Sequence, residues 1–339
     1  MRRSACLALL AAILFGAGVP LSKKLLGAVP FTALGAFLYC GSGMALALAW
    51  AARRGHGESR LRRSDLPWLA ASTAAGGVAA PLLLLWGLTK VAGLTASLLL
   101  NLEGVCTALL AGVIFREAVG LRVWIAAVLA TGAGALLAAP QGSSTTPWGA
   151  LAVAGACACW GLDNNLTRYL SGRDPVAIGC LKSLAAGLLM LAVSGFPSVP
   201  LPSLAAALGV GALSYGASLV CFVLALRGLG AARTAVLFGL APVVGALVSW
   251  RALGEPLGPP ALGAGALLAA AFWLLLGERH EHEHLHEETE HEHRHVHDGH
   301  HTHAHRGDEG PEPHAHPHRH ERLLHRHPHG PDLHHRHPH

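Results

Sequence analysis

Long apolar segments that follow one another almost without interruption constrain this chain more than any other feature. Residues 1–277 contain only 7 Asp and Glu and 18 Lys and Arg. A helix of about 20 apolar residues is long enough to cross the hydrocarbon core of a bilayer. Apolar runs between charged or Pro, Gly and Ser breaks predict ten membrane helices, near residues 4–22, 30–52, 67–89, 92–114, 121–139, 148–168, 175–195, 203–226, 231–250 and 258–277.

The distribution of positive charge between these helices predicts their orientation. With the N-terminus inside, thirteen arginines fall on the cytoplasmic side, and only Lys23, Lys24, Lys90 and Arg251 fall outside. Short cytoplasmic loops carry an excess of Lys and Arg. Because an even number of helices returns the chain to its starting side, we expect a multi-pass protein of the cytoplasmic membrane with both termini cytoplasmic. The basic residues are explained by topology, so nucleic-acid binding is not expected.

Matching landmarks suggest that the membrane region arose by duplication. Phe15-Gly16 with Lys23 in the first half matches Trp160-Gly161 with Arg168 in the second. The segment from Leu102 to Glu117 matches the segment from Leu240 to Glu255 at a constant offset of 138 residues. Each half would hold five helices, an odd number, so the second copy must be inverted relative to the first. Secondary transporters use this plan, with substrate bound near the bilayer midplane between the repeats.

At this point the chain resembles the EamA-type members of the drug/metabolite transporter superfamily, over residues 4–277. The landmarks above and Gly254-Glu255, with a relative in Arg116-Glu117, carry the resemblance. Pro242 matches a proline usual in the family's ninth helix, whereas Gly104 replaces it in the fourth, so a shift in helix bending is expected there. The resemblance implies transport of a small metabolite without ATP, and it does not fix a substrate.

The predicted fold is therefore an all-α integral membrane protein of ten helices in two inverted repeats, followed by a disordered tail. The repeats cover residues 1–139 and 148–277, and the tail covers residues 278–339. The membrane region has one histidine, His56, so no Ser-His-acid arrangement can be assembled there and no enzyme activity is expected.

Glu103 is the first candidate for substrate binding or ion coupling, because it lies near the middle of the fourth predicted helix. A mid-membrane acid costs roughly 2.5 to 3.5 kcal/mol, so it usually faces a cavity or a partner. One hypothesis is proton coupling or cation binding, helped by Asn101. The alternative is a neutral carboxyl that is hydrogen-bonded within the bundle.

Further polar candidates lie in the first, sixth and seventh helices. Asp163, Asn164 and Asn165 either coordinate a substrate or ion or form hydrogen bonds between helices. Lys182 either snorkels to the interface or pairs with Asp163 or Glu103. Lys23 lies at a helix end, where lysines usually anchor the interface, but its place in the family pattern keeps it as a candidate.

The tail is dominated by histidine, with 23 of the 24 histidines after residue 277. Neutral imidazoles bind Zn, Ni, Co and Cu, so this composition indicates a metal-chelating segment; the alternative is a low-complexity extension with incidental affinity. The candidate ligands are His280, His282, His284, His286, His291, His293, His295, His297, His300, His301, His303 and His305.

The leading hypothesis is an exporter of a small organic metabolite, proton-coupled through Glu103, with a tail that binds cytoplasmic metal. No cofactor is required, and the expected partners are the substrate, the lipid bilayer, divalent metal ions and a second copy in a homodimer. Two alternatives remain open. One is a transition-metal exporter whose tail collects ions, and the other is a metal store or sensor that the helices merely anchor.

Overall fold

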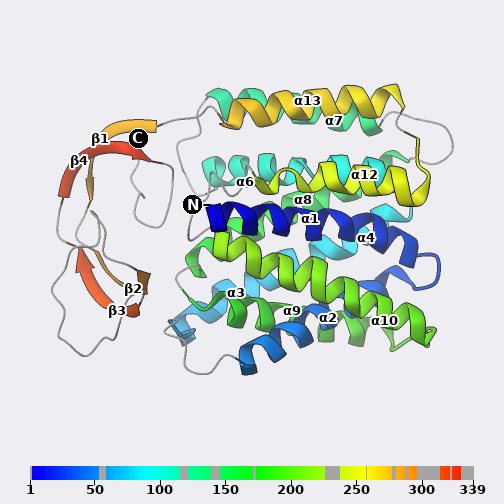
Figure 1. Cartoon of the computed structure of the whole chain (residues 1–339), viewed down its shortest axis with the longest axis horizontal. Coiled ribbons are helices and arrows are strands. Elements are labelled where there is room, and N and C mark those ends of the chain that lie inside the picture. Colours follow the sequence, from blue (N-terminus) through cyan, green and yellow to red (C-terminus); the bar gives the residue numbers. More distant parts are fainter. Residues whose placement is uncertain are drawn as a thin grey trace.

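The computed structural model is a bundle of long, roughly antiparallel helices (Figure 1). It describes residues 2–52, 59–114, 121–138, 146–170, 173–225, 237–256, 258–276, 280–286, 289–295, 314–320 and 323–329. The α-helices are α1 (Arg2–Leu25), α2 (Phe31–Ala52), α3 (Leu66–Ser72), α4 (Ala80–Leu88), α5 (Gly93–Leu99), α6 (Leu102–Val113), α7 (Leu121–Ala138), α8 (Pro147–Thr167), α9 (Pro175–Ser194), α10 (Leu201–Val210), α12 (Ala241–Leu253) and α13 (Pro259–Leu276).

Short 3₁₀ and π segments join some of these helices into longer ones. They are η1 (Arg63–Asp65), η2 (Thr73–Ala79), η4 (Arg168–Leu170) and η5 (Gly211–Ala217). The described residues thus fall into ten helical stretches. Five of these segments are long and apolar enough, by length and composition, to cross a membrane: Ser4–Leu25, Phe31–Ala52, Arg63–Leu88, Pro175–Ser194 and Leu201–Ala225. The all-α membrane fold predicted from the sequence is confirmed.

The packing of the helices repeats when the two halves are exchanged. Helix α1 packs against α12 as α8 packs against α6, and α2 packs against η5 as α9 packs against η2. The two largest contacts join equivalent helices, α2 with α9 and α7 with α13, and Figure 1 shows the α7 and α13 pair along one flank. This exchange pattern is the one that an inverted duplication produces.

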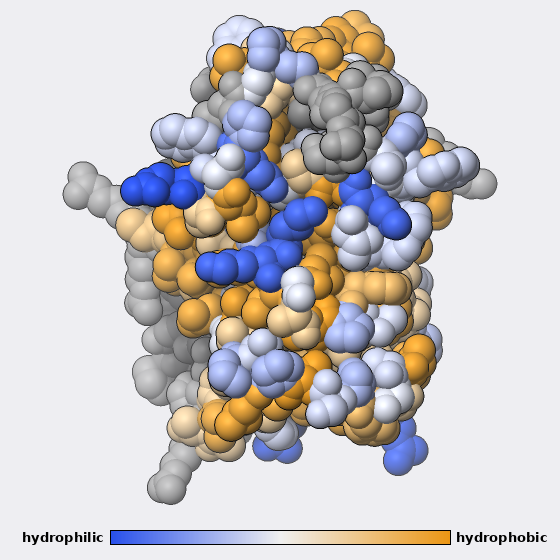
Figure 2. Space-filling model, turned by 90° about the vertical axis from the view of Figure 1, so that its right-hand side faces the viewer, coloured by the Kyte–Doolittle hydropathy of each residue, from blue (hydrophilic) through white to orange (hydrophobic). Residues whose placement is uncertain are grey.

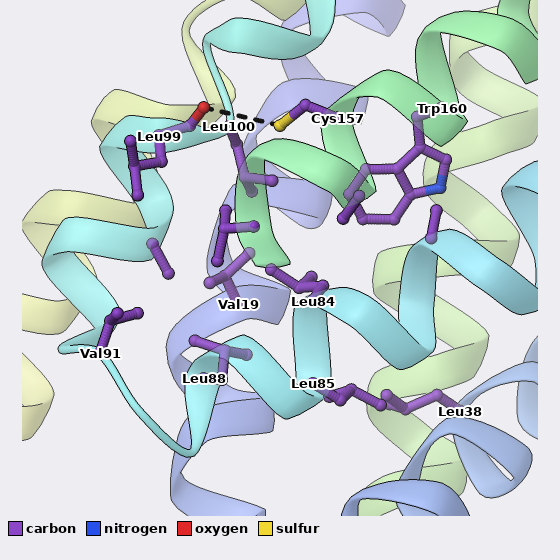
Figure 3. Packing of buried hydrophobic residues seen from close by; sticks show 14 of the residues in the cluster. Val19, Leu38, Leu84, Leu85, Leu88, Val91, Leu99, Leu100, Cys157 and Trp160 are labelled. Atoms are coloured by element: carbon purple, nitrogen blue, oxygen red, sulfur yellow. Dashed lines mark hydrogen bonds between the residues drawn. The ribbon is translucent and has the colours of Figure 1, made fainter. Parts of the chain in front are cut away.

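The two glycines of the duplicated landmarks explain why α1 crosses α12, and α8 crosses α6, so closely. A Cβ on Gly16 would overlap the Ala241 carbonyl, and a Cβ on Gly161 would lie 2.8 Å from the Thr107 nitrogen. Only glycine lets these backbones approach, as small residues do at membrane helix interfaces. The core beside them is apolar: in Figure 3, Leu84 and Leu88 pack near Val19 and the Trp160 ring.

Irregular backbone also recurs at equivalent positions. The π-helical segments η2 and η5 lie 138 residues apart, the offset already seen between Glu117 and Glu255. A turn interrupts the fourth stretch at residues 100–101, and another interrupts the ninth at residues 239–240. The second turn lies within one residue of the position that the offset of 138 predicts from the first. The fourth stretch is therefore broken although Gly104 stands where the ninth has Pro242. Discontinuous helices line the substrate sites of transporters with inverted repeats.

Two charged side chains hold the connection between α4 and α5 at one end of the bundle. Lys23 Nζ donates to the carbonyl oxygens of Leu88 at 2.6 Å and Val91 at 2.5 Å, which caps the end of α4. Glu255 accepts from the amides of Gly93 at 2.8 Å and Leu94 at 2.6 Å, which caps the start of α5. Figure 2 looks onto this end and shows strongly hydrophilic groups gathered within a mostly apolar surface.

Four segments of the tail fall within the described residues. They form four strands, β1 (His280–His286), β2 (Thr289–His295), β3 (His314–His320) and β4 (Leu323–His329). Strand β1 pairs with β4 and β2 with β3, both antiparallel. The recurrence of histidine at every second position matches the period of two of an extended strand. The end of α13 returns to the side where α1 begins (Figure 1).

We predict that Glu255→Ala lowers the thermal stability of the protein, because the first amides of α5 lose both acceptors. Loss of a helix N-cap costs about 1–2 kcal/mol. Glu255→Gln keeps one acceptor oxygen, so its melting temperature should fall between those of the Glu255→Ala variant and native protein. Thermal unfolding in detergent, followed by size-exclusion chromatography, measures the three proteins. Equal melting temperatures would show that the cap contributes nothing.

Candidate functional site

Six aromatic rings meet near the middle of the bundle, and they come from both halves of the chain. This aromatic cluster is centred on Phe15, whose ring centroid lies 6.0 Å from Trp160, 6.0 Å from Tyr215 and 5.5 Å from Phe238. It continues through Tyr39, 5.4 Å from Tyr215, and Phe222, 4.8 Å from Phe238. All five of these pairs are tilted or edge-to-face, and the ring quadrupoles favour such arrangements over a face-to-face sandwich.

The carbonyl oxygen of Gly76, inside the π-helical segment η2, fixes two of these rings. Tyr39 Oη and Trp160 Nε1 both donate to it, each at 3.0 Å. The amide of Ala80 donates to the carbonyl of Ala75, five residues earlier. With the same spacing of five residues, the carbonyl of Gly76 would need the nitrogen of Pro81 as its donor. Proline has no N–H. The two side chains therefore satisfy a carbonyl that the helix itself leaves without a donor.

Glu103 lies in the first turn of α6, immediately after the break in the fourth stretch. Its Oε1 accepts from Asn164 Nδ2 at 2.9 Å, and the same amide group lies 3.2 Å from Thr107 Oγ1. A carboxylate is favoured at a helix N-terminus, where the free amides carry positive partial charge. Asn165 Nδ2 donates to the carbonyl oxygens of Thr107 at 3.0 Å and Gly161 at 2.8 Å, which joins α8 to α6.

A second polar group joins α8 to α9 around Asp163. Lys182 Nζ forms an ion pair with Asp163 Oδ1 at 2.5 Å, and Thr167 Oγ1 donates to the same oxygen at 2.8 Å. Lys182 Nζ also lies 3.2 Å from Thr167 Oγ1. A Cβ on Gly76 would overlap Asp163 Oδ2. The aromatic cluster and the ion pair therefore meet at one glycine.

We call Glu103, Asp163, Asn164, Lys182 and the aromatic cluster the midplane site. Most of its members lie near the middle of their helical stretches, and those stretches belong to both halves. The rings of Phe15, Tyr215, Phe222 and Phe238 and the polar groups of Glu103, Asp163 and Asn164 are half-buried rather than fully enclosed. Carboxylate, amide and aromatic groups thus lie side by side at this place in the bundle.

The sequence candidates separate into those that meet and those that do not. Glu103, Asp163, Asn164, Asn165 and Lys182 all lie along the contacts that α8 makes with α6 and α9. The pairing of Lys182 with Asp163, one of two partners that the sequence suggested, is present in the structure. Asn101 lies at the break and donates to the Leu98 carbonyl at 3.1 Å, whereas Lys23 caps α4 at the end of the bundle.

The candidate metal ligands divide in the same way. His280 to His286 lie in β1 and His291 to His295 in β2, whereas His297, His300, His301, His303 and His305 lie outside the described residues. Among the residues that the structure describes, no group of three or more His, Cys, Asp or Glu side chains is placed to hold a metal ion.

Comparison with known proteins identifies the family. The EamA-like transporter family matches residues 2–139 and 147–277, which together cover most of the chain. The chain belongs to the EamA-like transporter family. It is accordingly a multi-pass membrane transporter, whose partners include the lipid bilayer and a small-molecule substrate.

Two curated relatives of this EamA protein are transporters by name. A protein of Methanothermobacter thermautotrophicus named "Uncharacterized transporter" is 32% identical over 268 residues, which cover 73% of this chain and 78% of the relative. A protein of Streptantibioticus cattleyicolor named "Probable terminal-alkyne amino-acid exporter" is 30% identical over 235 residues, 66% of this chain and 79% of the relative. A crystal structure with 20% identity shares the fold at a TM-score of 0.61, covering 81% of this chain and 96% of its own.

Sequence reasoning missed several members of the site in this EamA protein. Thr107 follows Glu103 by four residues, so a helical-face argument could have found it. The aromatic rings carry a weaker signal, because only their position near helix midpoints distinguishes them from packing residues. No local pattern marks Gly76, since its role depends on contacts with α2 and α8.

We predict that Gly76→Ala destabilises the transporter, because the added methyl group would occupy the position of the Asp163 carboxylate. Overpacking a filled interior typically costs about 1–3 kcal/mol. The matched control is Gly104→Ala, where a Cβ meets no atom within 4 Å and alanine favours the helix. Thermal unfolding should place the Gly76→Ala variant below native protein and the Gly104→Ala variant at or above it. Native stability in the Gly76→Ala variant would refute the close approach.

Proposed function

We propose that this EamA protein exports a small organic metabolite across the cytoplasmic membrane, with both termini in the cytoplasm. The observation that carries the proposal is the midplane site, in which polar and aromatic side chains from both repeats converge near the helix midpoints. Transporters built from inverted repeats bind substrate there and expose it alternately to each side. The name of the Streptantibioticus relative supports the direction of export.

The proposed moving units are the two repeats, residues 1–139 and 148–277. Broken helices and π segments occur at equivalent positions in each, where a helix can change its bend without losing all its backbone hydrogen bonds. The polar contacts Asn164 to Glu103 and Asn165 to Thr107 cross from one repeat to the other. A substrate bound among them would touch both units and so respond to their relative motion.

We further propose that export is coupled to protons through Glu103. Its carboxyl group accepts from an uncharged amide, and no Lys, Arg or His of the described chain lies within ion-pair distance. A charged carboxylate at this depth is costly, so protonation offers a low-energy state in which the site can reorient. Asp163 is less suited to this role, because Lys182 already balances its charge.

We predict that Glu103→Gln abolishes proton movement coupled to solute export, because an amide keeps the shape of the side chain but cannot ionise. Proteoliposomes that contain a pH-sensitive dye report proton movement when amines, amino acids and organic acids are added in turn. Native protein should give a signal with at least one class, and the Glu103→Gln variant with none.

Glu255→Gln serves as the control for this measurement, since it removes another carboxylate at the end of the bundle. It should leave the coupled signal in place. Solute export by the Glu103→Gln variant that still moves protons would rule out Glu103 as the coupling group, and absence of any solute movement by native protein would count against a transporter of these metabolites.

The histidine tail is proposed to bind Zn, Ni, Co or Cu on the cytoplasmic side, as a buffer beside the transporter. Its support is compositional: seven of the candidate histidines alternate with other residues along β1 and β2. Histidine is a good ligand for these metals in its neutral form. The competing hypotheses are a tail that feeds a metal exporter and a tail that serves as the main metal store.

We predict that cells with the full chain hold more metal than cells with residues 1–277, while solute export is the same in both. Growth at rising Ni, Co, Zn and Cu, with cell-associated metal measured alongside, makes the comparison. A full chain that lowers cell metal would favour metal export, and equal metal in both strains would show that the tail does not buffer it.

A further inference from the structure

Counting the charges of the midplane site shows that it lacks one positive charge. The described residues at the site include two carboxyl groups, Glu103 and Asp163, and one ammonium group, Lys182. Lys182 and Asp163 neutralise one another at 2.5 Å. When Glu103 is ionised, the site therefore carries a net charge of −1.

An ionised carboxylate in the middle of a membrane needs either a proton or a cation. The proposed function uses the proton. The same oxygen atoms of Glu103 can instead accept from the ammonium group of a substrate, which would supply the missing charge. Asn164 already donates to Oε1, and its amide holds the carboxyl group toward α8.

The surroundings of Glu103 favour an organic cation over a metal ion. Trp160 precedes Asn164 by four residues, so both lie on one face of α8 and the indole lies one helical turn from the amide that binds Glu103. Phe15 and Tyr215 extend this aromatic surface, and both are half-buried. Aromatic faces attract alkylammonium groups and pack against their apolar substituents. Metal ions of the Zn group prefer several imidazole, thiolate or carboxylate ligands.

The site offers little to a second, anionic group on the substrate. Lys182 is the one ammonium group among the described residues assigned to the site, and its Nζ already donates to Asp163 and Thr167. A carboxylate on the substrate would have to displace Asp163 from this ion pair or remain without a cationic partner. A monocation is therefore favoured over a zwitterion of the same size.

We propose that the midplane site binds a small organic monocation, an amine with an apolar or aromatic substituent, whose ammonium group replaces the proton on Glu103. This substrate class rests on the proposed function, because it names the solute that the same site would export. Since proton and ammonium group compete for one carboxylate, one would be bound as the other is released. Binding should weaken as the pH falls and protons occupy the carboxyl group.

Three probes that share a phenyl ring test the substrate class on the purified full chain. They are 2-phenylethylamine, a monocation; 2-phenylethanol, its neutral counterpart; and phenylalanine, its zwitterionic counterpart. Binding is measured by titration calorimetry at about pH 8 in detergent, where a carboxyl group in water is ionised and an alkylamine is protonated. We expect the amine to bind at least about tenfold more tightly than the other two, which is the size of one favourable charge interaction.

Variants show whether Glu103 is responsible for the preference. Glu103→Gln should reduce the preference for the amine over the alcohol to less than about twofold, because the remaining difference is only apolar contact. Glu103→Asp retains the charge and should retain part of the preference. Glu255→Gln, which removes a carboxylate at the end of the bundle, should bind as native protein does.

Each outcome decides the inference. Equal binding of amine and alcohol, tighter binding of phenylalanine, no binding of any probe, or a preference that survives in the Glu103→Gln variant would overturn it. If the inference fails while another solute still drives proton movement that depends on Glu103, the proposed function stands with a different substrate class. If no solute drives proton movement in native protein, the proposed function fails as well.

Discussion

The constraint that organises this structure is the absence of water from the interior of a bilayer. Every backbone polar group there must find a partner within the protein. The carbonyl of Gly76 illustrates the consequence: Pro81 cannot donate to it, so Tyr39 and Trp160 do, and these bonds hold two rings of the aromatic cluster. At the end of the bundle, Glu255 does the same for the amides of α5. The need for backbone partners thus positions side chains that the site uses.

Duplication supplies the framework, and departures from its symmetry supply the chemistry. Asp163 of the second repeat contacts Gly76 of the first, while the equivalent contact joins Gly18 of the first repeat to Ser214 of the second. Glu103 corresponds to Ala241 by the offset of 138. The helices and their breaks therefore repeat, whereas the ionisable groups occur once. A binding site that must recognise an asymmetric solute needs such differences, even though rocking between two states needs the repeat.

The sequence predicted helix positions well, because the signals are local. Helices expected at 30–52, 175–195 and 258–277 are found at 31–52, 175–194 and 259–276, where apolar length and proline or glycine mark the ends. The sequence could not predict the π segments, the contact of Asp163 with Gly76, or the choice of Asp163 over Glu103 as the partner of Lys182. Each depends on how α8 meets α6, α9 and η2, and no single segment contains that information.

The contrast between the two acids of the site carries the functional argument further. Asp163 is held by an ammonium group, a hydroxyl group and a tightly packed glycine, so changing its charge would leave Lys182 buried without an anionic partner. Removing one member of such a pair is strongly destabilising. Glu103 is held by an amide, which tolerates either the neutral or the ionised carboxyl group. The fixed pair thus stabilises the junction of α8 and α9, and Glu103 is the acid to which the proposed coupling assigns a change of occupant.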